Sequence, residues 1–163
     1  MRNPGFVAVH RGGDLSRENH VKLMQWAISC CKRVLAYWGE ELDETICHAI
    51  VVAEGWGSGL YTTGDAIRAS RSVHAHAREI TCPVAQAAAR AVGHGVATAH
   101  MADHALGAAL YAQKALKLAG QSYQEEGAWQ VEQLHHLPEG LAELVSSTLR
   151  VKAKGLGLLS LLE

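Results

Sequence analysis

The spacing of apolar positions predicts a chain of amphipathic helices separated by short polar turns. Between residues 17 and 38, apolar side chains recur three and four positions apart, while lysine and other polar residues occupy the opposite side. This period is typical of an α-helix with one buried face. Ser16 directly precedes the segment and is a good N-cap. The pattern therefore predicts a first helix from Arg17 to about Trp38.

Two further helices are predicted in the region before residue 81. Asp43 is the expected N-cap of the second helix, which runs to about Glu54 and is apolar on almost every side. We therefore expect it to be a central helix that is covered on several faces. Its histidine, His48, is expected to be a core residue with hydrogen-bonded ring nitrogens. Thr62, followed by an aspartate three residues later, resembles a capping box and predicts a third helix over residues 64–80.

Small residues dominate the stretch from Pro83 to Gly120, where 14 of the 38 residues are alanine. On a helix they form two stripes without large side chains, which allow neighbouring backbones to approach closely. The stripes consist of Ala85, Ala89, Gly93 and Ala97, and of Ala105, Ala108, Ala112, Ala115 and Ala119. One unbroken helix over residues 83–118 would be roughly 54 Å long, more than a domain of this size accommodates. We therefore expect a break near residues 100–103.

Two more amphipathic segments complete a predicted all-α fold. One spans residues 121–134, and the other begins at Pro138, whose ring favours the start of a helix. The chain is thus predicted to be a single-domain bundle of six or seven helices, with an irregular arm at residues 1–15, a helical core at 16–150 and a leucine-rich segment at 151–163. This last segment is too short to span a bilayer. It is expected to dock on the bundle or on a second subunit, so a homodimer is a further expectation.

Charge and composition narrow the classes of function. Fifteen Lys and Arg residues oppose sixteen Asp and Glu residues, for a formal net charge of −1. The chain therefore has no general basic field for nucleic acid or for an anionic membrane surface, and no apolar run approaches the length of a membrane span. The four cysteines form no C-x-x-C pair and no secretory signal precedes them. This favours a reduced, cytoplasmic protein whose cysteines are packing residues.

The charges are more strongly patterned than their sum suggests. Four basic residues recur three and four positions apart on the predicted third helix and form one basic stripe: Arg68, Arg71, His74 and Arg78. Between residues 118 and 149, five glutamates have no lysine or arginine in the same stretch: Glu125, Glu126, Glu132, Glu139 and Glu143. Two surfaces of opposite sign are therefore expected. The basic stripe is either a solvated face or a binding surface for a complementary protein.

A second candidate site is a group of histidines near the expected break. His100 and His104 lie four positions apart, so on a helix their rings share a face and could bind one transition metal, with His94 or Asp103 as a further ligand. In the alternative interpretation these residues only cap or join helix ends through hydrogen bonds. The segment lacks the glutamate of an H-E-x-x-H site and the carboxylate pairs of a di-iron bundle.

Motifs for nucleophilic catalysis and phosphate binding are missing from the sequence. It contains no G-x-S-x-G elbow, no Walker loop and no dinucleotide-binding G-x-G-x-x-G in the required strand–helix context. We therefore assign no catalytic residue, metal or cofactor. A metal- or cofactor-binding helical-bundle enzyme that uses His94, His100 and His104 stays an alternative.

Several segments of the chain share a pattern with a known all-helical family. The central segment runs from Ala89 through His94 and His100 to the stretch HALGAALYA that begins at His104. The supporting segments are Trp26-Ala27 with Cys31 ahead of Arg33-Val34-Leu35, the pair Trp56-Gly57, and Trp129-Gln130 followed by Leu137-Pro138. Together, over roughly residues 16–149, they resemble the putative immunity protein family of bacterial polymorphic-toxin systems.

The resemblance implies a non-enzymatic function. Proteins of this kind bind a cognate toxin inside the producing cell or its sister cells and block the toxin's activity. The resemblance carries over no catalytic residues. Inhibitors of nuclease toxins tend to be strongly acidic, whereas this chain is nearly neutral, so a nuclease target is not favoured. The protein-binding hypothesis ranks first, the metal- or cofactor-binding enzyme second and a structural oligomerising protein third.

Overall fold

Seven α-helices account for most of residues 1–39 and 41–158, the part of the chain that the computed structural model describes. They are α1 (Arg17–Leu35), α2 (Glu44–Gly57), α3 (Thr63–Glu79), α4 (Pro83–Ala97), α5 (His104–Leu118), α6 (Tyr123–Glu132) and α7 (Glu139–Gly155). Three short 3-10 helices accompany them: η1 (Pro4–Phe6), η2 (Val9–Arg11) and η3 (Gln133–His136). The all-α prediction is confirmed, since the described residues contain no strand beyond an isolated bridge between Ala8 and Leu15.

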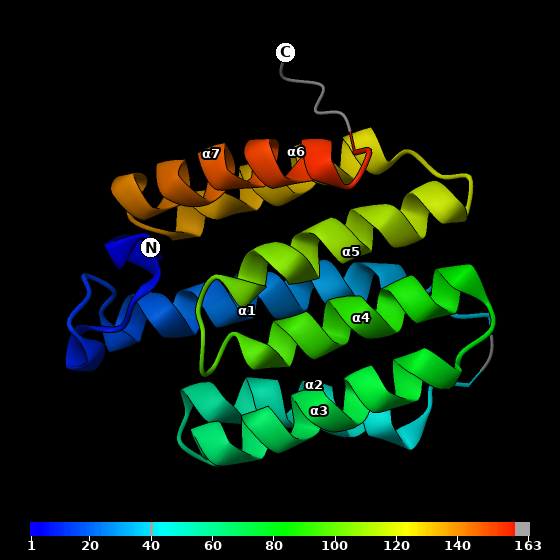
Figure 1. Ribbon diagram of the computed structural model, residues 1–163, viewed down its shortest axis with the longest axis horizontal. Helices are drawn as coiled ribbons and strands as arrows, with labels where there is room; N and C mark the ends of the chain where they lie inside the picture. The colour runs from blue at the N-terminus through cyan, green and yellow to red at the C-terminus, as the bar shows by residue number, and fades with distance from the viewer. Residues whose placement is uncertain (40, 159–163) are drawn as a thin grey trace.

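The helices are arranged in three layers (Figure 1). Helices α1, α4 and α5 form the middle layer, α2 and α3 cover one side, and α6 and α7 cover the other. Helices α4 and α5, joined by the loop at residues 98–103, share the most extensive contact, and α1 packs against both. The N-terminal arm lies at the end of the bundle where α1 begins. The α4–α5 loop is close to this arm, because the arm's Arg11 donates to the carbonyl oxygen of His100.

Local capping signals place the starts of the first three helices where the sequence predicts them. The Ser16 hydroxyl accepts a hydrogen bond from the backbone N–H of Asn19 at 3.2 Å. The Asp43 carboxylate accepts one from the N–H of Thr45 at 2.8 Å. Thr62 and the aspartate at N3 form the complete capping box. These bonds satisfy backbone N–H groups that have no partner inside the helix. Each capping residue bonds a neighbour only two or three positions away, so the sequence alone predicts the cap.

The structure corrects the expected position of α2. This helix lies in an outer layer beside α3 (Figure 1), and Cys47, His48 and Val51 are exposed on it. The expectation that His48 is a core residue is therefore wrong. The apolar residues of α2 surround the helix, so the sequence does not show which face the neighbouring helices leave in water; the side chain of Val51 is 51% exposed.

The alanine and glycine stripes of α4 and α5 lie in the core, and the predicted break separates the two helices at residues 98–103. All nine stripe residues are buried except Ala119, which is half-buried. From α1, the thiol of Cys31 donates to the carbonyl oxygen of Ala91 at 3.1 Å, and burial raises the pKa of this thiol to about 12. A Cβ atom at Gly95 would lie 3.0 Å from the Cys31 sulfur. Small residues thus allow α1 to approach α4 closely.

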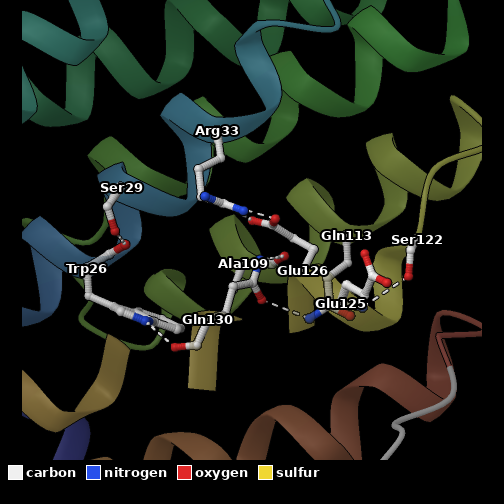
Figure 2. A network of polar contacts seen from close by, with 9 residues as sticks. All are labelled: Trp26, Ser29, Arg33, Ala109, Gln113, Ser122, Glu125, Glu126 and Gln130. Atoms are coloured by element: carbon white, nitrogen blue, oxygen red, sulfur yellow. Dashed lines mark hydrogen bonds and ion pairs between the residues drawn. The ribbon is translucent and has the colours of Figure 1, made fainter. Parts of the chain in front are cut away.

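A buried polar network attaches α6 to α1 and α5 (Figure 2). Gln130 is fully buried, and its Nε2 donates to the carbonyl oxygen of Ala109 at 3.0 Å while its Oε1 accepts from Gln113 at 2.8 Å. The indole N–H of Trp26 donates to the Gln130 carbonyl oxygen at 2.9 Å. This network is not evident from the sequence, because its members come from three separate helices.

Glu126 belongs to the same region and departs from the expected acidic surface. Its side chain is 4% exposed and accepts from Arg33 Nε at 3.0 and 3.1 Å. The Arg33 guanidinium also lies 3.9 Å from the ring centroid of Trp129. The sequence places no cation near Glu126 within residues 118–149, but α1 supplies one in space.

The C-terminal segment is described only in part. Residues 151–155 continue α7, and Leu158 is buried against the bundle. The remaining residues of the predicted leucine-rich segment, 159–163, lie outside the described residues. No helix in the described part of the chain is both long and apolar enough to cross a membrane.

Candidate functional site

The fold joins the two sites that the sequence predicts separately. His74, expected on the basic stripe, packs edge-on against His94 of α4 with 5.1 Å between ring centroids. The Nδ1 atoms of His94 and His104 are 3.1 Å apart, and the rings of His104 and His100 are 5.4 Å apart. These four residues, His74, His94, His100 and His104, form one histidine cluster contributed by α3, α4, the α4–α5 loop and α5.

Two glycines make room for the rings of the cluster. A Cβ atom at Gly93 would lie 2.7 Å from the His74 ring, and one at Gly107 would lie 2.7 Å from Cγ and Nδ1 of His94. The His94 ring also stacks on Tyr111, with centroids 5.3 Å apart and an interplanar angle of 13°. His94 is thus held between α4 and α5, and a side chain at Gly107 would displace it.

Burial keeps the histidines of the cluster neutral at neutral pH. Burial is the largest of the causes that lower the pKa of each of the four rings. The pKa of His94 falls to about 4, because His74 and His104 add to the effect of burial by repelling a positive charge on its ring. In the contact between His94 and His104, one Nδ1 must carry a hydrogen and the other must accept it. Two positively charged rings would remove this bond.

Cations surround the histidine cluster. Their charges lower the pKa of one or more of its rings, and they come from the arm, α3, α4 and α7: Arg2, Arg11, Arg71, Arg78, Arg90 and Lys152. Asp103 acts in the opposite direction on His100 and His104. Its Oδ2 accepts from Arg2 at 3.1 Å, whereas its Oδ1 is buried and has no hydrogen-bond partner among the described residues. The cluster therefore lies in a region of positive potential.

The basic stripe is not one continuous exposed row. Arg71 and Arg78 are exposed, and Arg68 is exposed but paired with Asp65 at 2.5 Å. His74 is half-buried because it turns towards α4. The exposed positive charge of α3 thus borders the histidine cluster.

The arrangement does not give a metal-binding geometry. Within residues 1–39 and 41–158, no group of three or more His, Cys, Asp or Glu side chains could hold a metal ion. Of the expected ligands, His94 and His104 use their Nδ1 atoms for each other and Asp103 uses one oxygen for Arg2. The geometry therefore does not favour the alternative of a metal-binding enzyme that uses His94, His100 and His104.

A cleft of about 680 Å³ opens beside the cluster, between the N-terminal arm and the bundle. We call it the arm cleft. Its arginines and histidines are Arg2, His10, Arg11, Arg17, His20 and His100, and no Asp or Glu side chain of the described residues lines it. His100 belongs both to the cleft and to the histidine cluster. The two features therefore adjoin at His100.

The arm cleft is not evident from the sequence. The available signal is the charge of the first twenty residues, which contain five basic or histidine side chains and only two acids, Asp14 and Glu18. Asp14 is exposed and does not line the cleft, and Glu18 pairs with Lys22 at 2.9 Å. The sequence does not show that the arm folds back over the α4–α5 loop, so these charges could not be combined with His100.

A comparison with known families matches most of the chain. The Imm-5 like putative immunity protein family matches it over residues 13–137. This range contains α1 to α6, η3 and the whole histidine cluster, and it leaves out residues 1–12 and α7. No curated protein and no solved structure matches the chain.

Proposed function

Because the chain belongs to the Imm-5 like putative immunity protein family, we propose that it neutralises a cognate bacterial toxin by binding it, without catalysis. The family match over residues 13–137 carries this proposal. The matched range contains the middle layer of the bundle, the outer layer of α2 and α3, and α6 from the other outer layer. The binding surface would therefore be built on a rigid set of packed helices.

The region of positive potential around the histidine cluster is where we expect the binding surface to lie. Arg71 and Arg78 are exposed beside the histidine cluster, and Arg90 is half-buried there. Exposed charges of one sign speed the approach of a complementary partner and disfavour partners of the same sign. We place the toxin on this side of the molecule, with the basic stripe at its border.

The cysteines support action in the cytoplasm, where the toxin would otherwise act on its producer. The four cysteines, Cys30, Cys31, Cys47 and Cys82, are all free thiols. Two of them are exposed, a state that a reducing compartment maintains.

Co-expression with the toxin domains encoded beside the gene tests the proposal. A growth-arresting domain is expected to lose its toxicity when this protein is made in the same cell, and the two proteins are expected to co-purify. An unrelated helical protein of similar size serves as the control. If no neighbouring product is toxic, or if the protein rescues none of them, the proposed function is wrong.

Titration of the purified toxin distinguishes binding from enzymatic inactivation. Toxin activity is expected to fall linearly and to reach its minimum near a fixed stoichiometric ratio, and the mass of the toxin recovered from the complex is expected to be unchanged. An enzyme would inactivate an excess of toxin at a small fraction of an equivalent. That outcome, or a change in toxin mass, would contradict a non-enzymatic function.

A further inference from the structure

The arm cleft has the charge of a site for anionic side chains. Its three arginines carry permanent charges, and among residues 1–39 and 41–158 only Arg2 of these three has an acidic partner, Asp103. The guanidinium groups of Arg11 and Arg17 are therefore uncompensated by acids inside the cleft. An anionic group that enters would meet two free positive charges in a partly enclosed space.

Arg11 and Arg17 each donate one hydrogen bond to a backbone carbonyl and keep most of their donors. Arg11 Nη1 donates to the carbonyl oxygen of His100 at 3.2 Å. Arg17 Nη2 donates to the carbonyl oxygen of Trp56 at 2.9 Å. A guanidinium group has five N–H donors, so each of these side chains retains several for a ligand. Carboxylates accept such donors in pairs with good geometry.

The part of the cleft formed by α1 and α2 is preorganised. The Arg17 guanidinium lies 3.8 Å from the centroid of the Trp56 ring, and His20 packs edge-on against the same ring at 4.9 Å. The indole N–H of Trp56 donates to Thr63 Oγ1 at 3.1 Å, and His20 Nε2 lies 2.6 Å from the Thr98 carbonyl oxygen. These bonds order the side chains before a ligand arrives, which lowers the entropic cost of binding.

We propose that the arm cleft binds acidic side chains of the toxin, a proposal that rests on the proposed function. The occupant is an Asp- or Glu-bearing segment of a protein, because the cleft is large enough for several side chains and mixes these cations with apolar walls such as Phe6 and Ile67. Three of its basic groups, Arg2, His10 and Arg11, lie outside the range that matches the family. The proposal thus goes beyond what the family match implies.

The first test uses the isolated protein and a hexaglutamate peptide, with the NMR signal of the Trp56 indole N–H as the local readout. The peptide is expected to shift this signal saturably at low salt, and the affinity is expected to fall about tenfold in Arg11→Glu. Arg11 is exposed and makes one hydrogen bond, so this variant is expected to fold. Arg17→Gln is the second variant and is expected to weaken binding as well.

Lys32→Glu is the matched control for charge reversal. Lys32 is an exposed residue of α1 that pairs with Glu54, and it lies fifteen positions beyond Arg17 on the same helix, roughly 22 Å away. This variant is expected to bind the peptide as the wild type does. Equal losses in Arg11→Glu and Lys32→Glu, or no shift of the Trp56 signal with hexaglutamate, would overturn the proposal. A shift with inorganic phosphate but none with hexaglutamate would also overturn it, in favour of a small anion.

The second test separates this proposal from the proposed function. A toxin domain that the wild-type protein neutralises is expected to bind Arg11→Glu at least about tenfold more weakly. If that toxin binds Arg11→Glu and the wild type equally, the cleft proposal is wrong and the immunity function stands. If the wild type neutralises no toxin, the immunity function is wrong, whatever the peptide does.

Discussion

Gly107 has no side chain, and this absence leaves the space that the His94 ring occupies in the histidine cluster. In an exposed helix, Gly→Ala usually stabilises by up to about 1 kcal/mol. At Gly107 the new Cβ would lie 2.7 Å from the ring of His94, which is already stacked on Tyr111. Gly107→Ala is therefore expected to lower the free energy of unfolding by about 1–3 kcal/mol.

Gly140→Ala is the matched control, because a Cβ atom at Gly140 in α7 would meet no described atom within 4 Å beyond its chain neighbours and its own helix backbone. This variant is expected to be neutral or slightly stabilising. Urea denaturation followed by circular dichroism measures both variants. Equal stability of Gly107→Ala and Gly140→Ala would contradict the described position of His94.

The lowered histidine pKa values predict that acid destabilises the protein. His94 has a pKa of about 4 in the folded protein against 6.5 unperturbed, so the unfolded chain binds more protons between these two values. The free energy of unfolding therefore falls as the pH drops through this window and is fully retained above it. His94 alone is expected to account for up to about 2 kcal/mol at about pH 5.

The groups that face His94 are His74, His104 and Tyr111, with Arg90 and Lys152 nearby. His94→Gln removes the titrating ring and is expected to flatten the pH dependence of stability, measured by urea denaturation at several pH values. His48→Gln, at an exposed position of α2, is the control and is expected to retain the wild-type slope. An unchanged slope in His94→Gln would contradict the burial of this ring.

Sequence reasoning succeeds at this scale where the interaction is local. The caps at Ser16, Asp43 and Thr62 each involve residues two or three positions apart. The contact between His74 and His94 joins residues twenty positions apart on different helices, and it depends on how α3 rotates against α4. Periodicity places His74 on a helix face but does not show which neighbour covers that face.

At the scale of elements, buried polar contacts attach α6 to the bundle beside its partly buried Tyr123, Trp129 and Val131. Its buried residues are Glu126 and Gln130, and both are bonded to other helices. Glu126→Ala removes the partner of Arg33 and is expected to lower the free energy of unfolding by about 2 kcal/mol. The neighbouring exposed residue in Glu125→Ala is the control (Figure 2), with an expected change within about 0.5 kcal/mol.

Urea denaturation is the measurement for this pair as well. A shift of the midpoint with an unchanged m-value in Glu126→Ala alone is the expected outcome. Similar midpoints for Glu125→Ala and Glu126→Ala would mean that the ion pair with Arg33 does not hold α6 in place.

The sequence predicts where the helices begin and end more closely than it predicts the layer in which each helix lies. The break between α4 and α5 is predicted because a stretch of this length is too long for one helix, and the structure places it at residues 98–103. The outer position of α2 was not predicted, because a helix with apolar residues on every side is compatible with either layer. The pairing of Glu126 with Arg33 was missed for a related reason, since the charge pattern within 118–149 contains no information about α1.

At the scale of the whole molecule, a net charge of −1 conceals an uneven distribution. The arm, α3 and α4 place arginines around the histidine cluster and the arm cleft, while Glu132, Glu139 and Glu143 are exposed on the layer of α6 and α7. The composition excludes a uniform basic field. It does not exclude a local basic surface, which appears only when the arm and the α4–α5 loop lie together.

Hydrogen exchange of the complex with a neutralised toxin domain tests the central claim most directly, because it maps the toxin on the surface. The account predicts protection of residues 1–17 and 98–104 and of the exposed side of α3 upon binding, with little change in α6 and α7. Protection confined to α6 and α7, with the arm and the α4–α5 loop exchanging as in the free protein, would contradict it.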